Sequence, residues 1–396
     1  MTSGPTDPMP LPPAVLEIAR TLEQAWFETW CVGGALRDWR LAPTQPLEHD
    51  VDLATAARPE EVQRLFRRTV AIGAKYGTVG VLDSAGGMHE VTTFRKDVVT
   101  DGRHAVVEYG VAIEEDLRRR DFTINAMAYH PLTHRWLDPE GGQADLEQGI
   151  IRAVGTPERR FAEDYLRILR MVRFAARFGF RIDPATFEAA RSAASGLVRL
   201  SAERVRDEWF KGMVTARSTR HFVELWHDVG AAAVWLPELR AAGSVPDRAG
   251  HALDPVVATA AFCEHPGEVL RRLKASGAEI ARGDAMQRGP AKPESNDPVA
   301  VRRWLASVAG AANDLLALAT FTGSAPAWQE VVMTIRQRGD ATSRAQLAVT
   351  GEDLLAAGFA PGPGLGELLA RLLDAVLEDP ARNNKERLLE LARTWR

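Results

Sequence analysis

Two carboxylates occupy alternate positions of a short apolar run, Asp50-Val51-Asp52-Leu53. Because successive side chains of a β-strand point to opposite faces, Asp50 and Asp52 share one face, about 6.6 Å apart along the backbone. Two carboxylates this close repel each other, and a cation between them relieves that repulsion. The spacing therefore indicates a divalent metal site.

A pair of glycines, Gly33-Gly34, precedes these carboxylates, and a helix-like segment that contains Arg37 follows the pair. Glycines let backbone N–H groups approach a phosphate closely, so a phosphate contact is expected beside the metal site. Glu90 lies in the alternating stretch 88–94 and is a candidate third carboxylate. An exposed strand glutamate is the alternative interpretation of Glu90.

Three consecutive arginines, Arg118-Arg119-Arg120, stand before Asp121. Holding three guanidinium groups together is costly without an anionic partner, and Asp121 supplies one negative charge. Because the guanidinium group is planar and always charged, it suits a triphosphate or a ribose-phosphate edge. The alternative is a basic helix start that Asp121 caps.

On one predicted helix, Asp164 and Arg167 are i,i+3 neighbours, and Arg170 and Arg173 continue the same ridge. Asp accepts hydrogen bonds and Arg donates them, so side by side they suit the edge of a nucleobase. The alternative is a Glu163–Arg167 ion pair on a helix surface, worth a few tenths of a kcal/mol.

The length and composition of the chain indicate its general class. A chain of 396 residues predicts two or three domains, and 45% hydrophobic with 26% charged residues is typical of a soluble globular protein. Two cysteines favour a reducing cytoplasm over a disulfide framework. Residues 1–12 are predicted to be a disordered leader rather than a signal peptide, and no membrane span is predicted.

Charge is unevenly distributed along the chain. The net charge is −4, yet residues 152–220 hold fifteen Lys and Arg against eight Asp and Glu, a surplus of seven positive charges. Such a segment suits a polyanion, and a solvated helical surface is the alternative.

The pattern of elements changes near residue 150. Before it, a helix over 13–30 and a helix over 59–68 alternate with short strands, which are expected around 30–33, 50–53, 69–73, 78–82 and 88–94. Residues 96–110 are expected to form a mobile loop or hairpin. From residue 161 the pattern is nearly all helical, with 161–178 as one helix and 276–298 as a linker or long loop.

The motifs share one order with a known family. They are Gly33-Gly34-Ala35-Leu36-Arg37-Asp38, Asp50-Val51-Asp52, Arg119-Arg120-Asp121-Phe122-Thr123-Ile124-Asn125-Ala126, Asp138-Pro139-Glu140-Gly141-Gly142 and Glu163-Asp164-Tyr165-Leu166-Arg167. Over residues 30–215 this series resembles the class II tRNA nucleotidyltransferases, which include the bacterial CCA-adding enzymes and the related poly(A) polymerases. The resemblance implies an α+β fold: a polymerase-β-like head with a mixed sheet, then an all-α neck, body and tail.

The resemblance also implies domain boundaries and residue roles. We expect a head over 13–150, a base-recognising neck over 151–215, a body with a linker over 216–298 and a tRNA-binding tail over 299–396. Asp50 and Asp52 would hold two Mg²⁺ ions, and Glu90 would be the third catalytic carboxylate. The implied nucleotide-binding residues are Gly33, Gly34, Arg37, Arg120, Asp121, Asn125, Asp164, Arg167, Arg170 and Arg173.

The function that the resemblance implies is template-independent addition of C and A, from CTP and ATP, to the 3′ end of tRNA in the cytoplasm. Three alternatives stay open. The first is an enzyme that adds only CC or only A, because loop 96–110 is slightly short for the family and lacks its usual proline. A poly(A) polymerase is the second, and an RNA-binding module without catalysis is the third. The sequence does not specify an oligomeric state.

Overall fold

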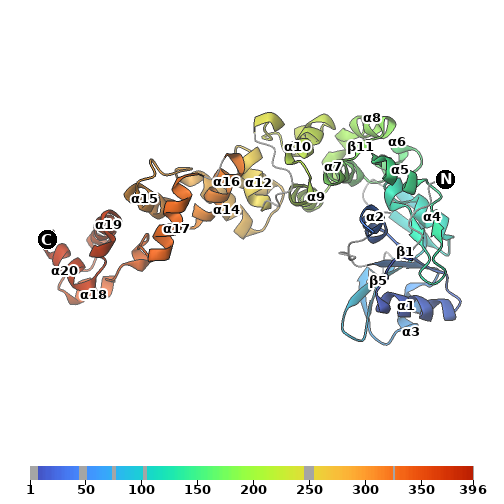
Figure 1. Cartoon of the computed structure of the whole chain (residues 1–396), viewed down its shortest axis with the longest axis horizontal. Coiled ribbons are helices and arrows are strands. Elements are labelled where there is room, and N and C mark those ends of the chain that lie inside the picture. Colours follow the sequence, from blue (N-terminus) through green and yellow to red (C-terminus); the bar gives the residue numbers. More distant parts are fainter. Residues whose placement is uncertain are drawn as a thin grey trace. The chain divides into compact units, whose positions relative to one another are not determined.

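A computed structural model of the chain describes residues 8–43, 51–73, 77–100, 105–244, 254–323 and 326–395 (Figure 1). The chain forms two compact units, Met1–Pro237 and Glu238–Arg396. The predicted body, 216–298, is therefore divided between them. Most of the predicted leader, Asp50 and the tip of the predicted loop at 101–104 lie outside the described residues.

A seven-stranded mixed sheet forms the centre of the head, in the order β3-β4-β5-β2-β1-β8-β9. Its strands are β1 (Thr29–Val32), β2 (Asp52–Thr55), β3 (Thr69–Gly73), β4 (Thr78–Leu82), β5 (Met88–Thr93), β8 (Ala128–Tyr129) and β9 (Trp136–Leu137). Strand β2 runs parallel to β5, and the other neighbours run antiparallel. The predicted α+β head with a mixed sheet is confirmed.

Residues that alternate along the strands cover two different faces of this sheet. One face, here the α1 face, carries Leu53, Val79 and Val91 and packs against α1 (Pro13–Gln24) and α3 (Pro59–Leu65). The other, here the α4 face, carries Val32 and Ala54 and packs against α4 (Ile113–Arg118). Asp52 and Glu90 alternate with the residues of the α1 face, so they belong to the α4 face.

Two smaller elements flank the sheet. Helix α2 (Gly34–Leu41) begins directly after β1 and buries Ala35 and Leu36 in the core of the α1 face. The predicted loop at 96–110 forms a hairpin of β6 (Arg95–Thr100) and β7 (Ala105–Tyr109), which is a separate two-stranded sheet.

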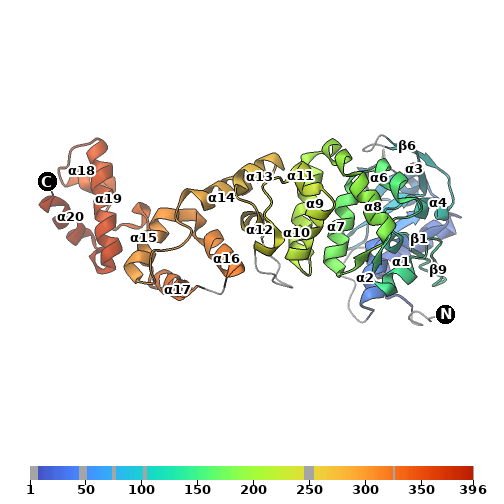
Figure 2. The ribbon, with the colours of Figure 1, turned by 90° about the horizontal axis from the view of Figure 1, so that it is seen from above.

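The rest of the first unit, which includes the predicted neck, consists of helices that pack side by side, as Figure 2 shows for α7, α9 and α10. The helices are α6 (Pro157–Glu163), α7 (Leu166–Phe178), α8 (Pro184–Ser192), α9 (Ala202–Thr215), α10 (Thr219–Asp228) and α11 (Ala231–Trp235). Close approach of α9 and α10 requires glycine at position 212, because a Cβ there would lie 2.0 Å from the ring of Phe222. Helix α7 ends at Gly179, whose φ of 67° is the usual left-handed helix stop.

The single helix predicted over 161–178 is wrong. Helix α6 ends at Glu163, and Asp164 is extended, with φ −155° and ψ 107°, before α7 begins at Leu166. The carboxylate of Asp164 accepts a hydrogen bond from the N–H of Leu166 at 3.0 Å. Asp164 therefore supplies one of the acceptors that the start of α7 needs, which stabilises the break.

Helices joined by turns and loops make up the described part of the second unit, apart from an isolated bridge between Leu239 and Cys263. Its helices are α12 (Pro255–Phe262), α13 (Pro266–Arg272), α14 (Gly277–Arg288), α15 (Pro298–Val308), α16 (Ala312–Thr322), α17 (Trp328–Arg338), α18 (Gly351–Ala356), α19 (Pro363–Glu378) and α20 (Lys385–Thr394). The linker predicted over 276–298 is wrong for its first half, which is α14. A capping box of Ser276 and Glu279 starts this helix, and Gly283 lets it pack closely on Gly267 of α13.

One stretch of the second unit, Pro298–Thr322, is long and apolar enough by composition to cross a membrane. It is two helices, however, separated by a turn at Ala309–Ala311 in which Ala309 has a φ of 42°. Its Arg302 is buried and pairs with Asp340 at 3.2 Å. Length and composition alone are weak evidence of a membrane span. The break between the two helices and the buried ion pair are features of packed helices.

Both cysteines of the chain are reduced and buried. Cys31 lies in β1 of the first unit, and Cys263 follows α12 in the second. Burial raises the pKa of both thiols, so neither is reactive in the folded protein.

Candidate active site

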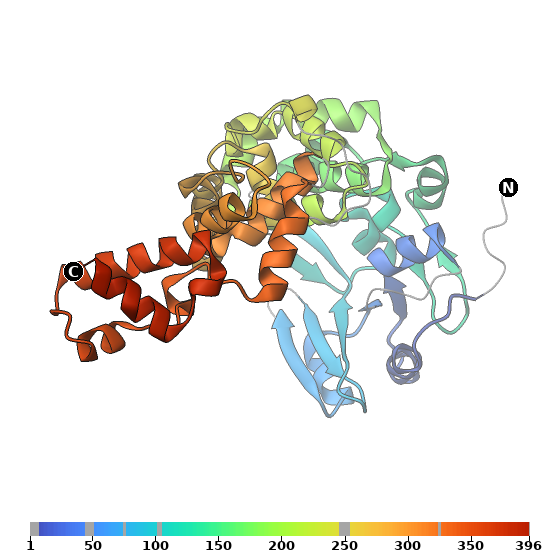
Figure 3. The same ribbon diagram turned by 60° about the vertical axis from the view of Figure 1, so that its left-hand side comes forward.

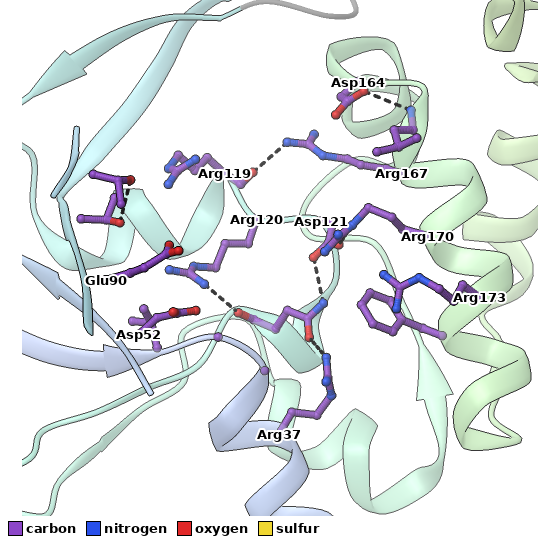
Figure 4. Close-up of a pocket in the computed structure, with 18 of the residues that line it drawn as sticks. Arg37, Asp52, Glu90, Arg119, Arg120, Asp121, Asp164, Arg167, Arg170 and Arg173 are labelled. Atoms are coloured by element: carbon purple, nitrogen blue, oxygen red, sulfur yellow. Dashed lines mark hydrogen bonds and ion pairs between the residues drawn. The ribbon is translucent and has the colours of Figure 1, made fainter. Parts of the chain in front are cut away.

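Residues from the head sheet and the neck helices line one cavity of about 570 Å³ (Figure 4). Twelve of the thirteen residues predicted for the site are on its wall: Gly33, Gly34, Arg37, Asp52, Glu90, Arg120, Asp121, Asn125, Asp164, Arg167, Arg170 and Arg173. The thirteenth, Asp50, lies outside the described residues. The structure therefore brings together residues that are up to 140 positions apart in the sequence (from Gly33 to Arg173).

Asp52 and Glu90 lie next to each other on the α4 face. The parallel register pairs Leu53 with Val91, so the residues one position earlier, Asp52 and Glu90, are also neighbours. Both side chains point into the cavity (Figure 4). Two adjacent carboxylates are a suitable donor set for a hard divalent cation.

The glycine turn packs directly against Asp52. Gly33 has a φ of +88°, and a Cβ at this position would lie 3.0 Å from Oδ2 of Asp52. Any other residue would be strained in the backbone and would press on the carboxylate. Glycine at position 33 therefore lets the start of α2 approach Asp52.

Arg37 is almost fully buried between the head and the neck. Its Nη1 donates to Oδ1 of Asn125 at 2.6 Å, and its Nε donates to Oδ1 of Asp38 at 2.8 Å. Its guanidinium carbon lies 5.1 Å and 4.8 Å from the ring centres of Phe174 and Phe178 in α7. Burial lowers its pKa, although Asp38 counteracts this effect. These contacts fix Arg37 in place before any ligand binds.

A chain of hydrogen bonds continues from Arg37 into the neck. Nδ2 of Asn125 donates to Oδ1 of Asp121 at 3.0 Å, and Nε of Arg170 donates to Oδ2 of Asp121 at 2.7 Å. We call this series, Arg37–Asn125–Asp121–Arg170, the buried relay. Burial alone would raise the pKa of Asp121, but Arg170, Asn125 and the N–H of Phe122 together lower it to about 2. Asp121 is therefore ionised at neutral pH.

Arg120 lies on the wall of the cavity. Its Nη2 donates to Asp116 at 3.2 Å, whereas its buried Nε–H has no acceptor among the described residues. A buried donor without an acceptor costs about 1–3 kcal/mol, so holding Arg120 in this position reduces the stability of the fold.

The two residues predicted to read a base are held by different partners. Oδ2 of Asp164 accepts from Arg204 of α9 at 2.7 Å. Arg167 donates to Glu163 at 2.7 Å and to the backbone carbonyl of Arg119 at 3.0 Å. Asp164 and Arg167 are thus not on one helical ridge, but both border the same cavity.

Sequence reasoning missed the part of the site that α9 supplies. Arg204 holds Asp164, and Oε2 of Glu208 accepts from Nε of Arg173 at 2.5 Å. The only local signal is that Arg204 and Glu208 are four positions apart, so they lie on one face of α9. Their partners are set by helix packing, which the sequence does not reveal.

The wall of the cavity is strongly cationic. Nine arginines border it, Arg37, Arg95, Arg119, Arg120, Arg167, Arg170, Arg173, Arg177 and Arg204, against four acids, Asp52, Glu90, Asp121 and Asp164. This leaves five positive charges in excess. Five of the nine arginines come from the basic segment 152–220, so the site suits a polyanion such as a nucleoside triphosphate.

Three family models match the chain. The model described as "Poly A polymerase head domain" matches residues 29–152, and "Probable RNA and SrmB- binding site of polymerase A" matches 179–242. A model of tRNA nucleotidyltransferase domain 2 matches 257–392. Together with adjacent carboxylates beside a glycine turn, these matches define the class of the protein as a nucleotidyltransferase.

Relatives that match nearly the whole chain identify a family within this class. The chain is 33% identical to the CCA-adding enzyme of Lactiplantibacillus plantarum over 96% of its own length and 95% of the relative's. It is 34% identical to that of Leuconostoc mesenteroides with the same coverage. Its structure resembles the Bacillus stearothermophilus CCA-adding enzyme in complex with CTP, with a TM-score of 0.80, 30% identity, and coverage of 97% and 98% of the two chains. The chain belongs to the CCA-adding enzyme family, class II tRNA nucleotidyltransferases.

Nucleotidyltransferases generally use divalent metal ions. Among the residues that the structure describes, no group of three or more His, Cys, Asp and Glu side chains could hold an ion. Asp50 is not one of these residues, while Asp52 and Glu90 have the chemistry that such an ion needs.

Proposed function

We propose that this protein adds C and A, from CTP and ATP, to the 3′ end of tRNA without a nucleic-acid template. The observation that carries the proposal is a single cavity that joins the carboxylates of the head to Asp164 and Arg167 of the neck. The relatives that cover nearly the whole chain are named CCA-adding enzymes, which supports the same activity.

The reaction is a nucleotidyl transfer. The 3′-hydroxyl oxygen of tRNA attacks the α-phosphorus of the nucleotide, a new P–O bond forms, and the bond to pyrophosphate breaks. Asp50 and Asp52 would hold two Mg²⁺ ions beside Glu90; such a metal pair lowers the pKa of the hydroxyl and stabilises the leaving pyrophosphate.

The protein itself contributes position and charge. Backbone N–H groups at Gly33 and Gly34 would approach the triphosphate beside Arg37. Arg120, which also lines the cavity, would bind the nucleotide beside them. Arg170 and Arg173 would bind phosphate or base from α7, where Asp121 and Glu208 already hold their guanidinium groups.

Base choice would depend on Asp164 and Arg167. C and A each carry an exocyclic amino group beside a ring-nitrogen acceptor, whereas U and G carry a carbonyl oxygen beside a ring N–H. Asp164 would accept from the amino group, and Arg167 would donate to the ring nitrogen. A site made of such hydrogen bonds rejects a wrong partner by up to about 10⁴–10⁵.

The test uses tRNAs that end before CCA, after its first C and after its second C, each with CTP and with ATP alone. We expect C to be added to the first two and A to the third. Incorporation into none of them would overturn the proposal. Addition confined to C or to A would instead identify a partial enzyme, and long A tails on generic RNA would identify a poly(A) polymerase.

We also propose the remaining assignments. Residues 13–150 are the catalytic head, 151–215 the neck that recognises the base, 216–298 the body, and 299–396 the tail that binds tRNA. A cytoplasmic location is supported by two reduced, buried cysteines, since oxidising compartments favour disulfides.

A further inference from the structure

Three exposed apolar side chains lie on β3 and β5, within the three strands at one end of the head sheet. Val70, Ile72 and Met88 are 44%, 43% and 44% exposed. A Cβ on Gly80 would lie 2.7 Å from Cδ1 of Ile72 and 3.0 Å from Sδ of Met88, so these two side chains close over Gly80. We call Val70, Ile72, Gly80 and Met88 the edge platform. Its strands are the light-blue arrows in Figure 3.

The edge platform is on the same face as the catalytic carboxylates. The antiparallel registers pair Val70 with Gly80 and Gly80 with Glu90, and Asp52 is the next neighbour on β2. These four positions therefore form one row across the α4 face. Since adjacent strands are about 4.8 Å apart, Gly80 lies about 10 Å and Val70 about 14 Å from Asp52 along that row.

The geometry of the nucleotidyl transfer indicates on which side of Asp52 the RNA primer lies. Gly33 follows β1, on the far side of β2 from β5. If the leaving pyrophosphate lies at Gly33 and Gly34, an in-line displacement places the attacking hydroxyl on the opposite side of the α-phosphorus. That side is the β5 side, and an RNA strand that approaches the carboxylates along the sheet extends over β4 and β3.

We propose that the edge platform is the seat of the RNA primer, where the bases just upstream of the 3′ end lie against Ile72 and Met88. This deepens the proposed function and rests on it. Bases stacked about 3.4 Å apart place roughly three nucleotides on a 10 Å path. Apolar contact with base faces does not depend on sequence, as a primer end that changes after every addition requires. Arg67 and Arg68 are exposed directly before β3, and Arg68, whose Nη1 donates to the carbonyl of Asp83 at 3.2 Å, adds positive charge for the phosphates.

The first test measures kinetics with Ile72→Ser, Met88→Ser and the double variant. Both side chains are exposed, so the fold should tolerate the changes. The matched control is Leu65→Ser, an exposed apolar residue (36%) of α3 on the other side of the sheet. We expect the double variant to raise KM for tRNA about tenfold and the control to leave it unchanged. KM for CTP should stay within about twofold in all variants.

An unchanged KM for tRNA in the double variant, with wild-type activity intact, would overturn the edge platform and leave the proposed function standing. A wild-type protein that incorporates no nucleotide would overturn both.

A second test does not depend on substitutions. A tRNA with a photoreactive base at the nucleotide before its 3′ end is irradiated with the wild-type protein, and the crosslinked peptide is identified. We expect the crosslink within residues 69–92. A crosslink confined to α7 or α9 would place the primer on the neck and refute the proposal.

Discussion

Replacement of Asp121 by Asn tests the energetic role of the buried relay. In the folded protein the pKa of Asp121 is about 2, against an ordinary value of 3.8. This depression of the pKa corresponds to roughly 2 kcal/mol of stability at neutral pH. Asp121→Asn removes this contribution and leaves the half-buried guanidinium group of Arg170 without its carboxylate partner. We therefore expect a loss of about 3 kcal/mol in the stability of the region around α7.

The sign of the pH dependence follows from the direction of the shift. Because the folded-state pKa is depressed, the contribution is complete above the unfolded pKa, near pH 4. It is lost as pH falls through the folded pKa, near pH 2. Wild-type stability should therefore decrease between pH 4 and pH 2 more steeply than that of Asp121→Asn.

The assay is hydrogen exchange resolved to peptides of α7, combined with urea unfolding from pH 2 to pH 7. Asp207→Asn is the control, because Asp207 pairs with Arg206 on an exposed surface of α9. That variant should change stability by less than about 0.5 kcal/mol. If Asp121→Asn and wild type show the same protection of α7 and the same acid dependence, the energetic account of the buried relay is refuted.

Three further predictions concern the reaction. Asp52→Ala should abolish nucleotide incorporation while tRNA binding in a filter assay stays within about twofold; retained incorporation would refute the catalytic role of Asp52. Arg204→Gln frees Asp164 to change rotamer, so kcat/KM for CTP should fall about tenfold and misincorporation of UTP should rise. The control variant, Arg206→Gln on the same helix, should behave as wild type. Gly33→Ala forces a Cβ into a left-handed backbone against Asp52, and we expect at least a tenfold loss of kcat with a modest drop in melting temperature; full activity would contradict the packing argument.

The strands and motifs of the head could be predicted because the patterns that indicate them lie within short stretches of sequence. Alternation along a strand is enough to place neighbouring carboxylates on one face, and the order of the motifs identified the family. The position of Glu90 beside Asp52 was only a hypothesis, because it depends on the parallel register between β2 and β5. These two residues are 38 positions apart in the sequence, and no local pattern specifies how two such distant strands align.

Two errors have physical causes that a sequence pattern does not contain. The helical period continues through 161–178, but the bond from Leu166 N–H to Asp164 and the ion pair with Arg204 stabilise an extended residue at position 164. The glycines and charges of 276–298 suggested a loop, whereas Gly283 serves close helix packing in α14. Arg204 and Glu208 were missed because ion pairs between helices depend on how the helices pack.

The placement of the two cysteines makes each unit of the chain separately observable. Each unit contains a single thiol, Cys31 or Cys263, and both are shielded from solvent. A pulse of thiol reagent therefore labels a unit only during the time in which it is open. The masses of peptides containing the two thiols would give two independent opening rates from one unmodified protein, and bound nucleotide should slow the labelling of Cys31.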